Sequence, residues 1–133
     1  MTTTSISVRT SRQVEMVDIT GRVRELVQQS GVTDGLCIVY VPHTTAGVLI
    51  NEGADPDVMT DLIAALDRMV PEAASYRHIE GNSPAHVKAV LVGSSATVIL
   101  AGGHLRLGTW QAIFFAEFDG PRHREVLVQI IPR

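Results

Sequence analysis

The stretch GLCIVYVPHTTAGVLINEGADPDV, residues 35–58, decides the fold because it contains two apolar runs of strand length followed by a helix start. The run 35–41 is rich in β-branched residues, which is typical of a central strand buried on both faces. The run 45–51 predicts the next strand, so that His43 lies in the bend between the two. The Asp-Pro pair at 55–56 then predicts a helix, since aspartate caps helices and proline suits their first turn.

The flanking segments indicate further strands grouped around helices. Residues 5–17 alternate between apolar and polar side chains, which predicts one or two strands and an opening hairpin. Helical spacing and turn residues predict helices from about 20 to 30, with Thr20 as N-cap, and from 83 to about 91. The tail 95–131, with Gly-Gly and Asp-Gly-Pro turns, is typical of an antiparallel meander. The predicted class is therefore α+β, with mostly antiparallel sheets packed against two or three helices.

Length and composition indicate one domain over 1–133 and exclude several partners. The 133 residues carry a net charge of -3 with 11 Lys and Arg spread along the chain, which gives no basic stripe for nucleic acid. No run approaches the roughly 20 apolar residues that span a bilayer, and the start of the chain has no export signal. The single cysteine, Cys37, lies in an apolar run, which predicts a core thiol and a reducing cytoplasm.

Three of the five histidines lie in separate polar loops and predict a shared site. They are His43, His78 and His86. His86 lies near the start of the third predicted helix, where the helix dipole favours a neutral imidazole able to bind a metal or accept a proton. The simpler alternative is that His43 is a hydrogen-bonded surface or core histidine. His43 and Glu52 bracket an extended strand, so they meet only if the segment bends or if different copies of the chain bring them together.

The long strand predicted just before the Asp-Gly-Pro turn carries polar residues among apolar ones. Trp110 and Gln111 begin it, and we expect Trp110 to pack in the core. Gln111 and Glu117 share one face of this strand, so each has to be solvated, paired or used in a site. His104 and His123 fall in turn or strand-end positions and are expected on the surface.

Three blocks of the sequence resemble the signature blocks of the YjbQ-like family. They are PHTTAGVLINEGADPDVMTDL, YRHIEGNSPAHVKAVLVG and LRLGTWQAIFFAEFDGPRHREVLVQI, and the similarity extends over nearly the whole chain. The resemblance implies a compact α+β fold, a homotrimer, and an accessory thiamine-phosphate synthase activity, which joins hydroxymethylpyrimidine diphosphate to thiazole phosphate. It places the family's polar positions on His43, Thr44, Asn51, Glu52, His78, Glu80, Asn82, His86, Trp110 and Gln111.

Two functions and one structural alternative follow. In the first, a small trimeric enzyme uses an intersubunit pocket in which the three histidines bind a divalent ion or a phosphate, while Glu52 or Glu80 transfers protons. Departing pyrophosphate needs positive charge, for which Arg77, Lys88 and Arg106 are candidates. Three imidazoles favour Zn²⁺ over Mg²⁺, and no paired-aspartate magnesium motif is present. In the second, the trimer binds a metal or anion without turnover. In the third, the structural alternative, the polar groups of the loops all have hydrogen-bond partners and form no site.

Overall fold

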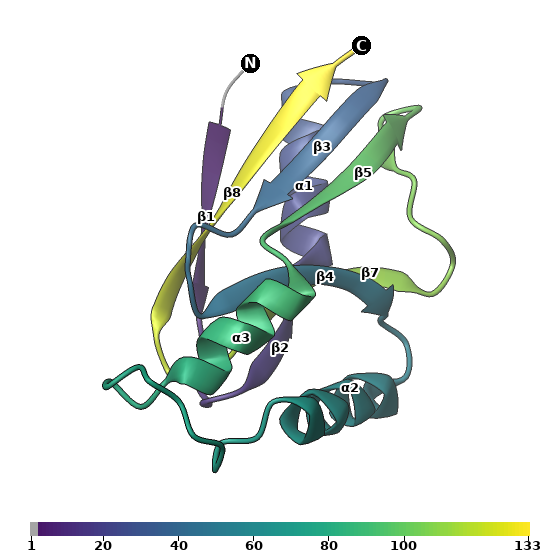
Figure 1. Cartoon of the computed structure of the whole chain (residues 1–133). Helices are drawn as coiled ribbons and strands as arrows, with labels where there is room; N and C mark the ends of the chain where they lie inside the picture. Colours follow the sequence, from purple (N-terminus) through teal and green to yellow (C-terminus); the bar gives the residue numbers. More distant parts are fainter. Residues whose placement is uncertain (1–2) are drawn as a thin grey trace.

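The computed structural model describes residues 3–133, and in this part of the chain three helices accompany two antiparallel sheets (Figure 1). Met1 and Thr2, which the predicted domain includes, lie outside the described residues. This architecture confirms the α+β class. The elements are β1 Thr3–Arg9, β2 Glu15–Asp18, α1 Thr20–Ser30, β3 Gly35–Tyr40, β4 Ala46–Glu52, α2 Pro56–Met69, α3 Ser83–Val92, β5 Ser95–Ala101, β6 His104–Leu105, β7 Gln111–Glu117 and β8 His123–Pro132.

The strands pair across long stretches of sequence. The larger sheet has the order β1-β8-β3-β5-β6, and the smaller has the order β2-β7-β4. The predicted opening hairpin is wrong, because β1 pairs with β8 while β2 pairs with β7. The predicted meander is confirmed only for β5 and β6, which pair across the Gly-Gly turn, and is wrong beyond them, because β7 and β8 belong to different sheets. Alternating polarity identifies a strand, but the partner is set by which apolar faces bury one another.

The smaller sheet is buried on both faces and separates two parts of the core. Ile113 and Phe115 of β7 face the larger sheet and α1 in the main cluster. Phe114 and Ala116 point the other way, towards α2 and α3. This placement explains why β7 is almost continuously apolar, as a strand covered on both sides has to be.

The helices begin and end close to the predicted positions. Asp55 caps α2 by accepting a hydrogen bond from the backbone N–H of Asp57, as predicted. Thr20 is not the N-cap of α1, because Ile19 holds that position. Instead, the Asp18 carboxylate accepts a hydrogen bond from the backbone N–H of Thr20. This bond satisfies one of the amides at the helix start that have no partner within the helix.

The strand β3 is central but buried on one face only. Cys37 and Val39 are fully buried, and burial raises the pKa of the Cys37 thiol to about 11, which confirms a core cysteine. Leu36 and Tyr40 on the other face are exposed, so the prediction of two buried faces is wrong for a single chain. The outer face of the larger sheet is thus partly apolar. No helix within residues 3–133 is long and apolar enough to span a membrane.

The third helix is pinned close to the bend that follows β3. The backbone N–H of Val41 donates to the carbonyl of Ser94, and the N–H of Val48 donates to the carbonyl of Gly93. A Cβ at Gly47 would come within 2.5 Å of the Gly93 carbonyl oxygen, so only glycine permits this approach. The contacts place the side of α3 beside residues 43–46.

Candidate functional site

The bend between β3 and β4, the start of α3 and the turn between β7 and β8 enclose a cavity of about 720 Å³, open to solvent. We call it the His43 cavity. Three segments that are distant in sequence therefore meet at one place (Figure 1). The lining residues are Tyr40, Val41, Pro42, His43, Thr44, Thr45, Glu80, Asn82, His86, Ser94, Asp119, Arg122 and Arg124.

A buried ion pair lies at the His43 cavity, which its arginine, Arg124, lines. Glu117 of β7 is fully buried, and it accepts hydrogen bonds from Arg124 of β8, with Nε 2.9 Å from Oε1 and Nη2 against Oε2. Thr10 donates to the same carboxylate at 2.8 Å. Burial raises the pKa of Glu117, but the hydrogen bonds and charge of Arg124 and the bond from Thr10 outweigh it, so the net pKa lies below its ordinary value.

Arg124 keeps one nitrogen for a ligand. Its Nη2 also donates to Thr45 Oγ1 at 2.8 Å, while its side chain is only 5% exposed. Within residues 3–133 no partner is found for Nη1, this atom is not among the buried unpaired ones, and Arg124 is one of the residues that line the cavity. A guanidinium fixed by a carboxylate with a free N–H group is an anion-binding group.

The His43 side chain contacts the backbone of β8 just beyond the last residue pair of β3 and β8. The pairing of β3 with β8 ends at Tyr40 and Leu127, and beyond it His43 Nε2 lies 3.0 Å from the backbone N and 3.1 Å from the carbonyl O of Glu125. Nδ1 has no partner within the described chain and is left for a ligand. Burial, and then the charge of Arg124, lower the pKa of His43, which keeps the imidazole neutral at pH 7.

An amide and a carboxylate form the opposite wall. Asn82 Nδ2 donates to Asp119 Oδ2 at 3.0 Å, and Arg122 Nη2 donates to the same oxygen at 2.9 Å. Burial raises the pKa of Asp119, but these two hydrogen bonds outweigh it and leave the net pKa below its ordinary value. Asn82 Oδ1 is buried without a hydrogen-bond partner in the described chain. The pair holds the start of α3 against the β7–β8 turn.

About half of the sequence-predicted residues lie at this cavity. His43, Thr44, Glu80, Asn82 and His86 line it. Two further predicted residues, Arg77 and His78, lie beside it and share a smaller hollow with His86. The rings of His78 and His86 pack edge to face, with centroids 5.2 Å apart.

The other predicted residues lie elsewhere. Asn51 and Glu52 end β4, and Glu52 is in register with Gln111, beside Trp110, whose carbonyl accepts the Gly53 N–H. Trp110 is 64% exposed, so its predicted packing in the core is wrong for the single chain. Trp110 is exposed because it lies just before β7 begins and therefore belongs to neither apolar face of that strand.

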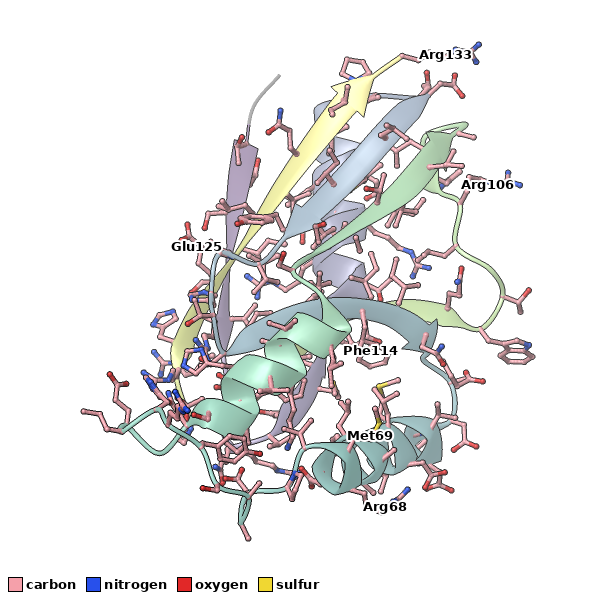
Figure 2. All side chains as sticks on the ribbon, in the orientation of Figure 1. Arg68, Met69, Arg106, Phe114, Glu125 and Arg133 are labelled. Carbon is pink, nitrogen blue, oxygen red and sulfur yellow. The ribbon has the colours of Figure 1, made fainter. Side chains whose placement is uncertain are left out.

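Two of the predicted cations also lie away from the His43 cavity. Lys88 is 2% exposed and is paired with Asp67 of α2. Arg106 follows β6 and points outwards on the side of the molecule opposite Glu125 (Figure 2). The charge available to a ligand in the His43 cavity thus comes from arginines that sequence reasoning did not select.

The predicted three-histidine metal site does not form within the described part of one chain. No group of three His, Cys, Asp or Glu side chains in residues 3–133 is arranged to hold a metal ion. His86 contacts His78 on one side and shares the cavity with His43 on the other. These residues alone do not fit a resident metal.

Sequence reasoning missed Asp119, Arg122 and Arg124. The signal was present in the unusual Glu117, an acid within the apolar run FFAEF. Such a residue requires a partner, and the basic residues of the following segment PRHRE are the nearest candidates in the sequence. Glu117 was predicted to be solvated, paired or used, and the pairing is confirmed. Gln111, on the same face, is exposed.

Comparisons with known proteins agree with the predicted family. A family model described as UPF0047 protein YjbQ-like matches residues 4–133. A UPF0047 protein of Methanocaldococcus jannaschii is 52% identical over 124 residues, which cover 93% of this chain and 90% of the relative. The UPF0047 protein YugU of Bacillus subtilis is 46% identical over 128 residues, covering 96% and 97% of the two chains.

Solved structures show the same fold. The crystal structure of a YjbQ/UPF0047 family protein from Clostridium acetobutylicum matches with a TM-score of 0.95 and 52% identity, over 96% of this chain and 99% of that one. A hypothetical protein from Aeropyrum pernix matches with a TM-score of 0.95 and 38% identity over 100% of both chains. Given its sequence and fold, this chain belongs to the YjbQ-like UPF0047 family.

Proposed function

We propose that the chain is an enzyme that binds a small phosphorylated ligand in the His43 cavity. The observation that carries this proposal is Arg124, a guanidinium 5% exposed and held by Glu117, with Nη1 free at the cavity. A phosphate oxygen bound there needs little reorganisation, because the donor is already fixed. Beside it, His43 keeps Nδ1 available as a donor or acceptor. A phosphate group between these two side chains is the arrangement that the geometry favours.

The reaction suggested by the family resemblance is the accessory thiamine-phosphate synthase reaction, which releases pyrophosphate. Charge on the departing pyrophosphate calls for positive groups, and Arg124 and Arg122 provide them at this cavity. Glu80, also at the cavity, is the carboxylate placed to exchange a proton with a bound ligand. The alternative is a binding protein without turnover, since the same groups hold an anion equally well.

Calorimetric titration with pyrophosphate tests the proposed anion site. Glu117→Gln/Arg124→Gln replaces the buried ion pair by two uncharged amides and leaves no buried charge uncompensated, so the fold is expected to persist, and thermal unfolding checks this. We expect binding to weaken at least about tenfold, the effect of losing one charged hydrogen bond. Arg106→Gln, which removes an exposed arginine outside the cavity, is the matched control and should bind as the original does. Equal binding by the double variant would contradict the proposal.

Turnover is tested by product formation from hydroxymethylpyrimidine diphosphate and thiazole phosphate. Glu80→Gln is expected to abolish or strongly reduce product while pyrophosphate binding persists, whereas His43→Ala is expected to weaken both. A purified protein that binds pyrophosphate but forms no product would instead favour the binding protein.

We also propose a homotrimer in which another copy supplies Glu52 to the His43 cavity. The support is that the two groups of predicted residues lie at opposite ends of β4 and that large apolar side chains of the outer sheet face are exposed. Mixed oligomers test this: His43→Ala and Glu52→Ala subunits, each inactive alone, should regain activity when assembled together. No recovery in verified mixed oligomers would contradict a shared site.

A divalent ion, zinc or magnesium, remains part of this proposal only if a second copy or the ligand completes its coordination. Metal analysis of the purified protein, with and without pyrophosphate, tests for it. Metal lost in both His43→Ala and His86→Ala would support it.

A further inference from the structure

Thr10 is a buried polar residue that follows β1 directly and does not itself line the His43 cavity. It continues the face of β1 that carries Ile6 and Val8, which both pack in the main core. Alternation along the strand therefore favours an apolar side chain at this position. Valine has almost the same shape as threonine, so the hydroxyl is what distinguishes the residue that is present.

The Thr10 hydroxyl lies between the buried ion pair and the turn that follows β7. Its Oγ1 donates to Glu117 Oε1 at 2.8 Å and accepts the backbone N–H of Arg122 at 2.8 Å. The Thr10 N–H donates to the Arg122 carbonyl at 2.9 Å. Thr10 and Arg122 thus continue the pairing of β1 with β8 by one position, with a hydroxyl in place of one backbone group.

Both arginines that line the cavity depend on groups that this hydroxyl holds. Glu117 Oε1 also accepts from Arg124 Nε at 2.9 Å, so the hydroxyl and the guanidinium share one carboxylate oxygen. The side chain of Arg122 bonds within its own turn, to the carbonyl and the carboxylate of Asp119. The hydroxyl of Thr10 therefore anchors the carboxylate that holds one guanidinium and the backbone that carries the other.

We infer that Thr10 is a positioning residue of the anion site, whose hydroxyl fixes Arg122 and Arg124 relative to one another so that both bind one ligand. This inference rests on the proposed anion site and adds the residue that organises it. Arg124 is almost fully buried, whereas the side chain of Arg122 is about half exposed and comes from a turn. Without a common anchor the two donors would have to be ordered when the ligand binds, which lowers affinity.

Calorimetric titration with pyrophosphate tests the inference. Thr10→Val keeps the shape and removes the hydroxyl, so we expect binding to weaken about tenfold, the lower end of what losing an outer hydrogen-bond partner costs at metal sites. Thr10→Ser restores the hydroxyl and should bind nearly as the original chain does. Urea unfolding checks that each variant is folded.

Thr20→Val is the matched control for this titration. Thr20 is also buried, and its Oγ1 accepts the backbone N–H of Ile113 at 2.8 Å, but it does not line the cavity. Loss of this hydroxyl should lower stability and leave pyrophosphate binding unchanged. If Thr10→Val does not fold, Thr10→Ala and Thr20→Ala repeat the comparison.

NMR of the arginine Nε–H groups reports on the geometry of Arg124 without a ligand. Its signal should shift in Thr10→Val, because Nε and the hydroxyl share one oxygen, and should stay in place in Thr20→Val. An unchanged signal in Thr10→Val would contradict the inference.

The titration also separates this inference from the proposed function. If the original chain does not bind pyrophosphate, the anion site is wrong and the inference falls with it. If the original chain binds and Thr10→Val binds equally, the anion site stands and the inference is overturned. It is overturned as well if Thr20→Val weakens binding as much as Thr10→Val, because the loss then follows from stability alone.

Discussion

The two ends of β4 differ in how firmly their polar residues are held. At the His43 end, Arg124 and Glu117 are buried together and Thr45 bonds to the guanidinium. At the Glu52 end, the polar side chains are solvent-facing and bond mainly to their own backbone, as Glu52 does with the N–H of Ala54. One end is therefore a charged cavity held by buried side chains of a single chain, whereas the other is open to solvent. The family resemblance alone does not reveal this difference between the two ends of β4.

The buried pair gives the largest expected difference between the two ends. Glu117→Leu leaves the Arg124 charge buried without its counter-ion, so we expect the free energy of unfolding to fall by about 3–5 kcal/mol. Urea unfolding at neutral pH measures this. Glu52→Gln, at the exposed end, should change stability by less than about 0.5 kcal/mol.

The double variant Glu117→Leu/Arg124→Met provides the control for this prediction. It removes both charges, and we expect it to recover most of the lost stability, because no buried charge is left uncompensated. A Glu117→Leu chain as stable as the original would show that Arg124 is solvated, which contradicts a rigid cavity wall.

A smaller effect is expected at Lys88, which was predicted to bind substrate. Its ammonium group is buried and paired with Asp67, so Asp67→Asn should lower the free energy of unfolding by about 1–3 kcal/mol, the cost of weakening a buried charged hydrogen bond. Binding of pyrophosphate should not change. Loss of binding with unchanged stability would instead assign Lys88 to the ligand site.

Acid titration of stability tests the buried pair at the His43 end, with an effect confined to low pH. The pKa of Glu117 is lowered in the folded chain, so its stabilising contribution is complete above the ordinary value of 4.5 and is lost as the pH falls through the folded value. Urea unfolding of Glu117→Gln should therefore show a shallower loss of stability in acid. Identical curves for Glu117→Gln and the original chain would contradict the assignment.

Local sequence patterns predicted most elements but not the site's electrostatics. The limits of α1 and α2 and the bend at His43 follow from capping residues, helical spacing and apolar runs, which act over a few positions. Glu117, an acid within an apolar run, indicated that a basic partner was needed, but which arginine it meets depends on how β7 and β8, in separate sheets, pack against each other. Because of this, the histidines were identified from sequence and the arginines were not.

The smallest expected effect concerns Trp110, which reports on the exposed end directly. It is the only tryptophan and is 64% exposed, so the dissociated chain should show the red-shifted emission of a solvated indole. If another copy brings this end to the His43 cavity, emission should shift to the blue as protein concentration rises, in step with the mass from light scattering. Glu52→Gln should preserve the dilute spectrum, since it leaves Trp110 in place. A trimer whose emission stays red-shifted would show that the exposed end remains free, and the shared site would then have to be abandoned while the single-chain cavity remains.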